Sequence, residues 1–180
     1  MYGMIHCAVR DMIIVHRGYE EWEEVEREAE ITPADQITLK VYDDAVTMHI
    51  INAAAARLGV DVPDCLLMLG RHWIKYSARG TFKSVMEFTG GDIVTFLENL
   101  DQMHRAVKRT MPSAQMPSFE VIEEEELAFK VRYRSEREGL GTFLPGLLEG
   151  LLDYFHLDGD VKLVDQGSSG MDFRINYRKR

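Results

Sequence analysis

The sequence has little cysteine and no long apolar run. Its two cysteines, Cys7 and Cys65, lie alone among apolar neighbours, and neither belongs to a CxxC pair. This pattern argues against a disulfide framework and a thiolate zinc site. No stretch reaches the roughly 18 consecutive apolar residues of a transmembrane helix, so we expect no membrane insertion. Residues 1–10 lack the basic start and the small-residue cleavage site of a signal peptide, which predicts a cytoplasmic protein.

Basic residues are also scarce. The chain has 21 Lys and Arg against 30 Asp and Glu, a net charge of −9. Such an acidic surface argues against binding nucleic acid by neutralising phosphates. The acidic residues gather between Glu20 and Glu28, on one face of a predicted helix. This run predicts a solvated helix face, with a partner-binding surface as the alternative.

Apolar residues recur at spacings of three and four throughout the first 110 residues, which predicts amphipathic helices. Gly18 and Gly59 stand where helix C-caps are expected, and Pro63 falls in a first turn. Asp92 can cap a long helix that follows the break at Gly90-Gly91. We therefore expect helices at about residues 5–17, 19–29, 44–58, 61–76 and 93–107.

The period changes after a proline-bounded segment, residues 111–117. Leu127, Phe129, Val131 and Tyr133 alternate with polar residues, as in a half-buried strand. Residues 119–121 predict its hairpin partner across an acidic turn, residues 123–126. An apolar helix stripe, residues 144–155, and two strands, 161–165 and 171–177, follow. We predict a single α+β domain over residues 1–180, with a helical half (1–110) and a β-β-α-β-β half with an antiparallel sheet (118–180).

His104 lies on the apolar face of its predicted helix, four residues after Leu100 and three before Val107. Burying an imidazole without a partner is costly. The plain interpretation is a hydrogen-bonded core histidine, and the alternative is a metal ligand. A single histidine ligand with no second ligand nearby suits haem, because the porphyrin supplies four nitrogens.

Tyr133, Ser135 and Arg137 share one face if the strand continues past Tyr133. Each step along that face is ~6.6 Å. Two hydroxyls and a guanidinium in a row suit a pair of carboxylates or a phosphate, and the plain alternative is a solvated strand end. Together with His104, the row describes a pocket for haem and its two propionates.

Five segments carry a resemblance to a known family. They are Met1-Tyr2-Gly3-Met4-Ile5, Gly70-Arg71-His72-Trp73-Ile74, Phe96-Leu97-Glu98-Asn99-Leu100-Asp101-Gln102-Met103-His104, Pro117-Ser118-Phe119, and the YxSxR triple that ends at Arg137. In this order they resemble the H-NOX domain, the haem–nitric oxide/oxygen binding domain of bacterial gas sensors and soluble guanylate cyclase. The resemblance spans nearly the whole chain.

The resemblance implies haem b, held between the helical half and the α/β half. It implies that His104 is the proximal iron ligand and that Tyr133, Ser135 and Arg137 hold the propionates. Pro117 matches the proline that packs on the porphyrin and distorts it. The implied distal-pocket residues are Ile5, Val9, Trp73, Ser77, Thr142, Phe143 and Leu144.

The residues that the resemblance places on the distal side of the haem indicate which gas binds. Oxygen-binding members of the family carry a distal tyrosine, and Thr142 stands at that position here. Bound oxygen is strongly polarised and needs a donor, whereas bound nitric oxide depends less on one. The resemblance thus implies nitric oxide, and also carbon monoxide, as ligands. The Thr142 hydroxyl and the Trp73 indole keep an oxygen- or redox-responsive sensor open as an alternative, although a threonine hydroxyl can turn to its own helix backbone.

The family resemblance also implies how the signal leaves the domain. Nitric oxide is expected to weaken the bond to His104 and to shift the two halves between two states. We expect no enzymatic activity, and signalling in trans to a histidine kinase or a cyclic-di-GMP enzyme.

Two rival functions remain at the level of sequence. A haem peroxidase would need a distal histidine–arginine pair, but Arg71 and His72 are neighbours on a helix and do not face the same way. The other rival is a ligand-binding or interaction module without haem, in which His104 is a core residue.

Overall fold

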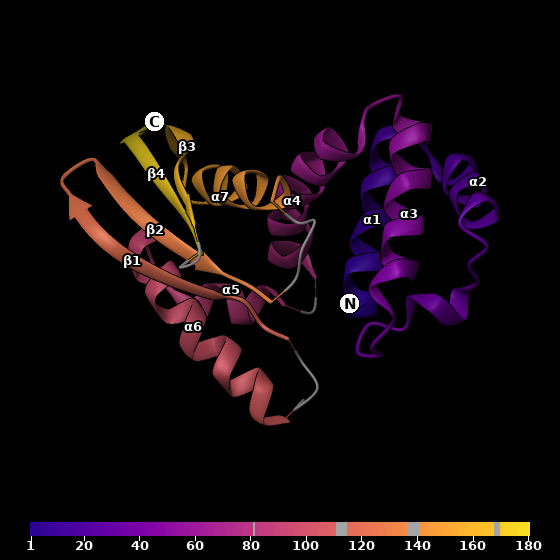
Figure 1. The fold of residues 1–180 in the computed structure, drawn as a ribbon, viewed down its shortest axis with the longest axis horizontal. Helices are drawn as coiled ribbons and strands as arrows, with labels where there is room; N and C mark the ends of the chain where they lie inside the picture. Colours follow the sequence, from indigo (N-terminus) through magenta and orange to yellow (C-terminus); the bar gives the residue numbers. More distant parts are fainter. Residues whose placement is uncertain (81, 111–114, 137–140, 168–169) are drawn as a thin grey trace. The chain divides into compact units, whose positions relative to one another are not determined.

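The computed structural model describes residues 1–80, 82–110, 115–136, 141–167 and 170–180. Helices come first and an antiparallel sheet follows, so the predicted α+β fold class is confirmed (Figure 1). In chain order the elements are α1 Gly3–Arg17, α2 Tyr19–Glu28, the short 3-10 helix η1 Pro33–Gln36, α3 Asp44–Leu58, α4 Val62–Arg79, α5 Lys83–Thr89, α6 Ile93–Thr110, β1 Ser118–Glu125, β2 Ala128–Arg134, α7 Phe143–Tyr154, β3 Leu157–Gly167 and β4 Gly170–Lys179.

The chain forms two compact units. The N-terminal unit consists of Met1–Tyr76 with Thr142–Leu147, and the sheet unit consists of Ser77–Gly141 with Leu148–Arg180. This division does not coincide with the change of composition at residues 111–117. Helices α5 and α6 belong with the sheet because α6 packs against β1. A helical sequence pattern identifies a helix but not the element that it packs against.

The N-terminal unit has a core formed by α1, α2 and α3. Asp43 caps α3 by accepting a hydrogen bond from the Ala45 backbone N–H at 2.8 Å. Gly59 ends this helix in the left-handed conformation, with φ of 74°, as expected for a C-cap glycine. The largest fully buried side chains in this unit are Met12, Ile13, Trp22, Ile50, Ile51, Leu69 and Leu144.

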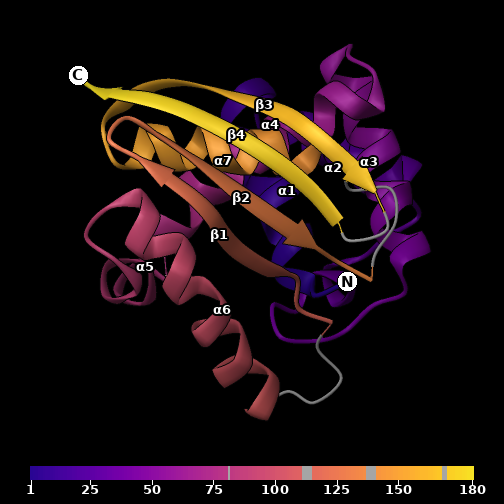
Figure 2. The same ribbon diagram turned by 60° about the vertical axis from the view of Figure 1, so that its left-hand side comes forward.

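The sheet unit contains four antiparallel strands in the order β1-β2-β4-β3 (Figure 2). Phe129 and Val131 of β2 pair in register with Ile175 and Phe173 of β4, and all four side chains are buried on the inner face. The opposite face is charged. Arg132, for example, donates two hydrogen bonds of 2.7 Å to the carboxylate of Asp172.

Some element boundaries differ from the sequence prediction. Residues Glu123–Glu125 are part of β1 and not a turn. Their charge is compatible with a strand because Glu123 pairs with Lys130 at 2.8 Å across the sheet. Leu127 was expected to face the core, but it lies in the turn with 55% of its surface exposed, and Ala128 is buried instead.

Two further elements differ. The third strand begins at Leu157, four residues before the predicted start. The structure also contains α5, a seven-residue helix that no apolar stripe announced, because Val85 and Phe88 are exposed on it. Within the ranges given above, no helix has the length and apolar character needed to cross a membrane.

Candidate haem-binding site

His104 is half-buried on α6, and its two ring nitrogens have different surroundings. Nδ1 is 2.9 Å from the carbonyl oxygen of Pro117. A carbonyl oxygen only accepts, so Nδ1 carries the proton and Nε2 keeps its lone pair. Burial lowers the pKa of His104, and the hydrogen bond to Pro117 partly opposes this effect. The imidazole is therefore neutral, in the tautomer that suits a metal ligand at Nε2.

Residues between Asp92 and His104 fix where α6 begins and which parts of the sheet unit it packs against. Asp92 caps the helix by accepting from the backbone N–H of Thr95 at 2.9 Å. Phe96 and Leu97 are buried in the core of the sheet unit. Asn99 donates from Nδ2 to the carbonyl of Thr89 at 2.8 Å, which ties the end of α5 to α6.

Asp101 ties the same helix to the start of β1. Its Oδ1 accepts a hydrogen bond from the backbone N–H of Phe119 at 2.6 Å. Asp101 and His104, one helical turn apart, thus hold the segment Pro117–Phe119 at two points. These two bonds fix the position of the Pro117 carbonyl that orients the imidazole.

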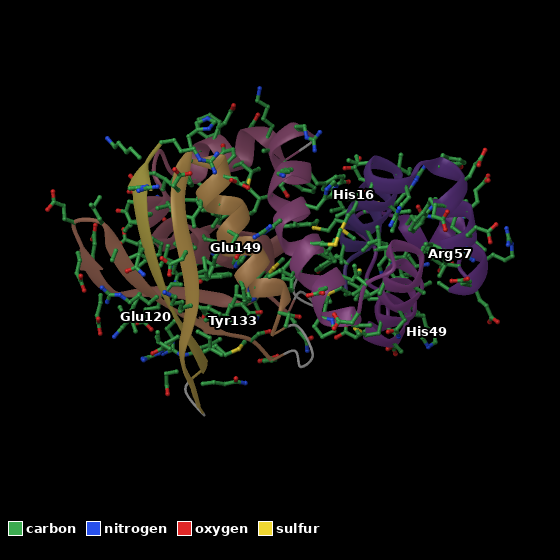
Figure 3. All side chains as sticks on the ribbon, turned by 90° about the horizontal axis from the view of Figure 1, so that it is seen from above. His16, His49, Arg57, Glu120, Tyr133 and Glu149 are labelled. Atoms are coloured by element: carbon green, nitrogen blue, oxygen red, sulfur yellow. The ribbon has the colours of Figure 1, made fainter. Side chains whose placement is uncertain are left out.

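A row of rings leads from His104 to Tyr133. The ring centroids of His104 and Phe119 are 6.1 Å apart, and those of Phe119 and Tyr133 are 5.2 Å apart. Phe119 and Tyr133 are register partners on β1 and β2, and both are buried. The structure therefore brings His104, Pro117 and Tyr133 to one end of the sheet unit. Figure 3 labels Tyr133 beside the sheet.

Sequence reasoning assigned Phe119 to a strand but gave it no role at the site. Its buried position between His104 and Tyr133 follows only from the pairing of β1 with β2. Of the other predicted propionate ligands, Ser135 is exposed just after β2, and Arg137 lies outside the described residues.

The predicted distal residues lie mainly in the N-terminal unit. Ile5 and Trp73 are half-buried, Leu144 is buried and Thr142 is exposed. The other two in this unit are Val9, which is fully buried, and Phe143, which is half-buried. Ser77 belongs to the sheet unit and is also buried, and its hydroxyl has no hydrogen-bond partner among the described residues.

Two glycines allow α4 and the start of α7 to touch within the N-terminal unit. A Cβ added at Gly70 would lie 2.1 Å from the carbonyl oxygen of Phe143, and one at Gly146 would lie 2.0 Å from that of Leu67. Any side chain at either position would push the two backbones apart. This contact places the segment with Leu144 against the helix that carries Trp73.

His72 and Arg71 do not form the pair that a peroxidase would need. His72 is buried, with Nε2 2.6 Å from the Asp11 carboxylate, whereas Arg71 is exposed. The expectation that these neighbours face different ways is met.

The acidic run on α2 is partly used inside the N-terminal unit. Arg57 of α3, labelled in Figure 3, bonds to Glu21 at 3.4 Å, to Glu24 at 3.2 Å and also to Glu28. Glu26 accepts a hydrogen bond from Gln36 at 2.6 Å. Much of this face is therefore an internal ion network, which leaves fewer carboxylates for a partner than the sequence suggested.

The residues around His104 fit haem. In the described ranges, no three His, Cys, Asp or Glu side chains come close enough to hold a metal ion. This surrounding suits a metal that brings most of its own ligands, as the iron of haem does. The imidazole would supply one axial nitrogen to haem, and the aromatic row beside it would supply an apolar surface.

Comparison with known proteins agrees with this chemistry. The model of the family described as Haem-NO-binding matches residues 2–163. The soluble guanylate cyclase gcy-37 of Caenorhabditis elegans is 29% identical over 170 residues, which cover 92% of this chain and 24% of that protein. The soluble guanylate cyclase subunit beta-2 of Rattus norvegicus is 29% identical over 101 residues, 56% of this chain and 15% of that protein. The chain spans about a quarter of the length of the curated relatives that it matches over most of its own length.

Solved structures share the fold. An H-NOX protein from S. oneidensis in the Fe(II)NO state superposes with a TM-score of 0.82 at 19% identity, covering 99% of this chain and 100% of that one. The unliganded Fe(II) H-NOX protein from K. algicida gives 0.78 at 19% identity, covering 100% and 98%. The domain that the family model describes is a haem-based gas-sensing domain without catalytic activity of its own. Because the family model matches residues 2–163, nearly the whole chain, the protein belongs to the haem-NO-binding (H-NOX) family.

Proposed function

We propose that this protein binds haem b through Nε2 of His104 and senses nitric oxide, with carbon monoxide as a second ligand. One observation carries the proposal: the Pro117 carbonyl holds the proton on Nδ1 at 2.9 Å and leaves Nε2 free to bind iron. Bound haem would supply an iron atom with an open axial position for a diatomic gas. The proposal includes the cytoplasmic location that the sequence led us to expect.

Other residues would position the haem. Pro117 would pack against the porphyrin, and Tyr133, Ser135 and Arg137 would hold the propionates through two hydroxyls and a guanidinium. The burial of Tyr133 beside Phe119 supports this role, since it fixes the ring that carries one hydroxyl. Ile5, Trp73 and Leu144 would line the distal side with apolar surface.

The same contacts would carry a signal out of the site. His104 is bonded to Pro117 and Asp101 to Phe119, so a displacement of α6 pulls on the start of β1. A change at the imidazole can therefore reach the surface of the sheet unit through two hydrogen bonds. We propose that a histidine kinase or a cyclic-di-GMP enzyme reads this change in trans.

Absorption spectra test the proposal. The anaerobically reduced protein should show a Soret band that shifts with nitric oxide and with carbon monoxide but not with air. Replacing His104 with Gly should abolish the ferrous spectrum, and added imidazole should restore it. His49→Gly, at an exposed histidine, should change nothing. A colourless protein after haem addition, or a His104→Gly protein with an unchanged spectrum, would refute the assignment.

Oxygen sensing is the second candidate, and Ser77 favours it. In the part of the chain that the structure describes, its buried hydroxyl has no hydrogen-bond partner, and the family resemblance puts this position on the distal side. A partnerless donor in a buried site is costly unless a ligand uses it. A stable spectrum of the oxygen complex in air, lost in Ser77→Ala but kept in Thr142→Val, would favour oxygen over nitric oxide as the ligand.

A further inference from the structure

Strand β3 forms an open edge of the four-stranded sheet. In the sheet order β1-β2-β4-β3, it pairs with β4 on one side only. Among the described residues, Asp160, Lys162 and Leu163 at its centre are exposed, and Figure 2 shows β3 as an outer strand of the sheet. An open edge carries unpaired backbone N–H and C=O groups that can extend the sheet with another strand.

The side chains of this edge are divided by face. Val161 and Leu163 pair in register with Ile175 and Phe173, whose side chains belong to the inner, apolar face. Leu163 nevertheless has 49% of its surface exposed. Asp160 and Lys162 alternate with them on the outer face and carry opposite charges. The centre of the edge is thus apolar on one face and charged on the other.

We propose that β3 pairs antiparallel with β3 of a second copy of this chain, about a two-fold axis through Val161. Residues directly opposite in an antiparallel pair share a face. In this register each Asp160 lies opposite Lys162 of the other copy, which gives two reciprocal ion pairs. On the inner face, each Leu163 lies opposite Gly159 of the other copy, which has no side chain.

The neighbouring symmetric registers are disfavoured by charge. An axis through Asp160 would place that carboxylate against its own copy, and an axis through Lys162 would do the same with two ammonium groups. Like charges directly opposite destabilise a sheet. The shift of register between Leu163 and Asp165 ends the regular pairing on one side. The paired stretch is therefore short, so the dimer is expected to be transient.

Charge reversal tests the register. Asp160→Lys alone creates two lysine–lysine contacts across the axis, and Lys162→Asp alone creates two aspartate–aspartate contacts. Each variant should raise the dimer dissociation constant by about tenfold or more. An equimolar mixture of the two should associate again, because both contacts then pair a lysine with an aspartate. Sedimentation velocity over a concentration series measures this.

The mixture separates pairing between copies from effects within one chain. Asp160 and Lys162 also form an ion pair of 3.0 Å within the strand, and each variant loses it. Mixing cannot restore that bond, so recovered association must come from the other copy. Glu20→Lys and Lys83→Asp, at exposed positions outside the sheet, carry the same charge changes as matched controls. Their mixture should sediment as the wild type does.

Disulfide trapping gives an independent readout of the axis. Val161 is the one position that meets itself, so Val161→Cys should form a covalent dimer on mild oxidation and Leu163→Cys should not. A wild-type chain that stays monomeric up to millimolar concentration overturns the proposal. A mixture of reversed variants that fails to associate, or trapping at Leu163 rather than Val161, also overturns it.

Discussion

Two buried histidines, His6 and His104, differ in how many of their ring nitrogens are bonded. His6 is fully buried in the N-terminal unit, with Nδ1 2.6 Å from the carbonyl of Asp35 and Nε2 2.8 Å from the Thr47 hydroxyl. Among the described residues, His104 in the sheet unit forms a hydrogen bond through Nδ1 only, to Pro117. A histidine with both nitrogens used is a structural crosslink, whereas one with a free Nε2 is available as a ligand. Nothing in the sequence indicated that both ring nitrogens of His6 are hydrogen-bonded.

Replacing His6 should have the largest effect on stability. His6→Leu removes two hydrogen bonds and leaves the Asp35 carbonyl and the Thr47 hydroxyl without their partner in a buried site. We expect the free energy of unfolding to fall by about 2–4 kcal/mol. Urea titration followed by circular dichroism measures it. His49→Leu is the control, since His49 is exposed and should change stability by less than about 0.5 kcal/mol. Equal losses in the two variants would contradict the structural role of His6.

Replacing Asp101 tests whether the segment that orients His104 is held by this carboxylate. Asp101→Ala frees the backbone N–H of Phe119 and loosens the segment that holds the Pro117 carbonyl. We expect a loss of about 1–3 kcal/mol, because the bond involves a charged acceptor. We also expect a shifted or broadened ferrous Soret band, which Asp101→Asn should largely restore. Glu98→Ala, on the exposed side of the same helix, is the control. A spectrum that is unchanged in Asp101→Ala would show that this bond does not position the imidazole.

Acid should weaken the N-terminal unit through His6. Burial lowers the pKa of His6 below its ordinary value of 6.5, and the nearby chain amino group lowers it further, while the bond to the Asp35 carbonyl opposes the shift. The unfolded chain therefore takes up a proton near pH 6.5 before the folded one does. Stability is full above pH 6.5 and falls as the pH decreases below it, by at most about 1.4 kcal/mol per pH unit for one group. Urea midpoints of wild type and His6→Leu between pH 7.5 and 5 measure this slope. A slope that is no smaller in the variant would assign the pH dependence elsewhere.

The smallest effect is expected from Arg57, whose ion network lies near the surface of the N-terminal unit. Arg57→Ala breaks its bonds to Glu21, Glu24 and Glu28, which leaves three carboxylates close together. Solvent screens such pairs, so we expect only a slightly lower melting temperature, and a smaller difference at high salt. Thermal unfolding in low and high salt measures both. A large, salt-independent loss would mean that Arg57 acts through packing.

Much of the fold followed from short-range patterns. The period of three and four placed His104 on an apolar helix face, and period-two alternation placed Tyr133 inward on a strand. Capping residues Gly59 and Asp92 lie where their chemistry suggested. Leu127 was misplaced because alternation cannot distinguish the last residue of a turn from the first of a strand. The short helix α5 was missed because its exposed apolar residues show no stripe.

The sequence by itself determined which residue types are available: a lone histidine on an apolar stripe, a tyrosine inside a strand and a motif typical of haem proteins. The first two follow from helix and strand geometry, which depend on residues close in the chain, and the third from the resemblance to a known family. Only the tertiary structure decided which nitrogen of His104 is free, because its partner Pro117 lies beyond the end of α6. It also decided that Asp101 holds Phe119 and that Arg57 neutralises the face of α2. Such bonds join residues far apart in sequence, and packing rather than local spacing brings them within reach.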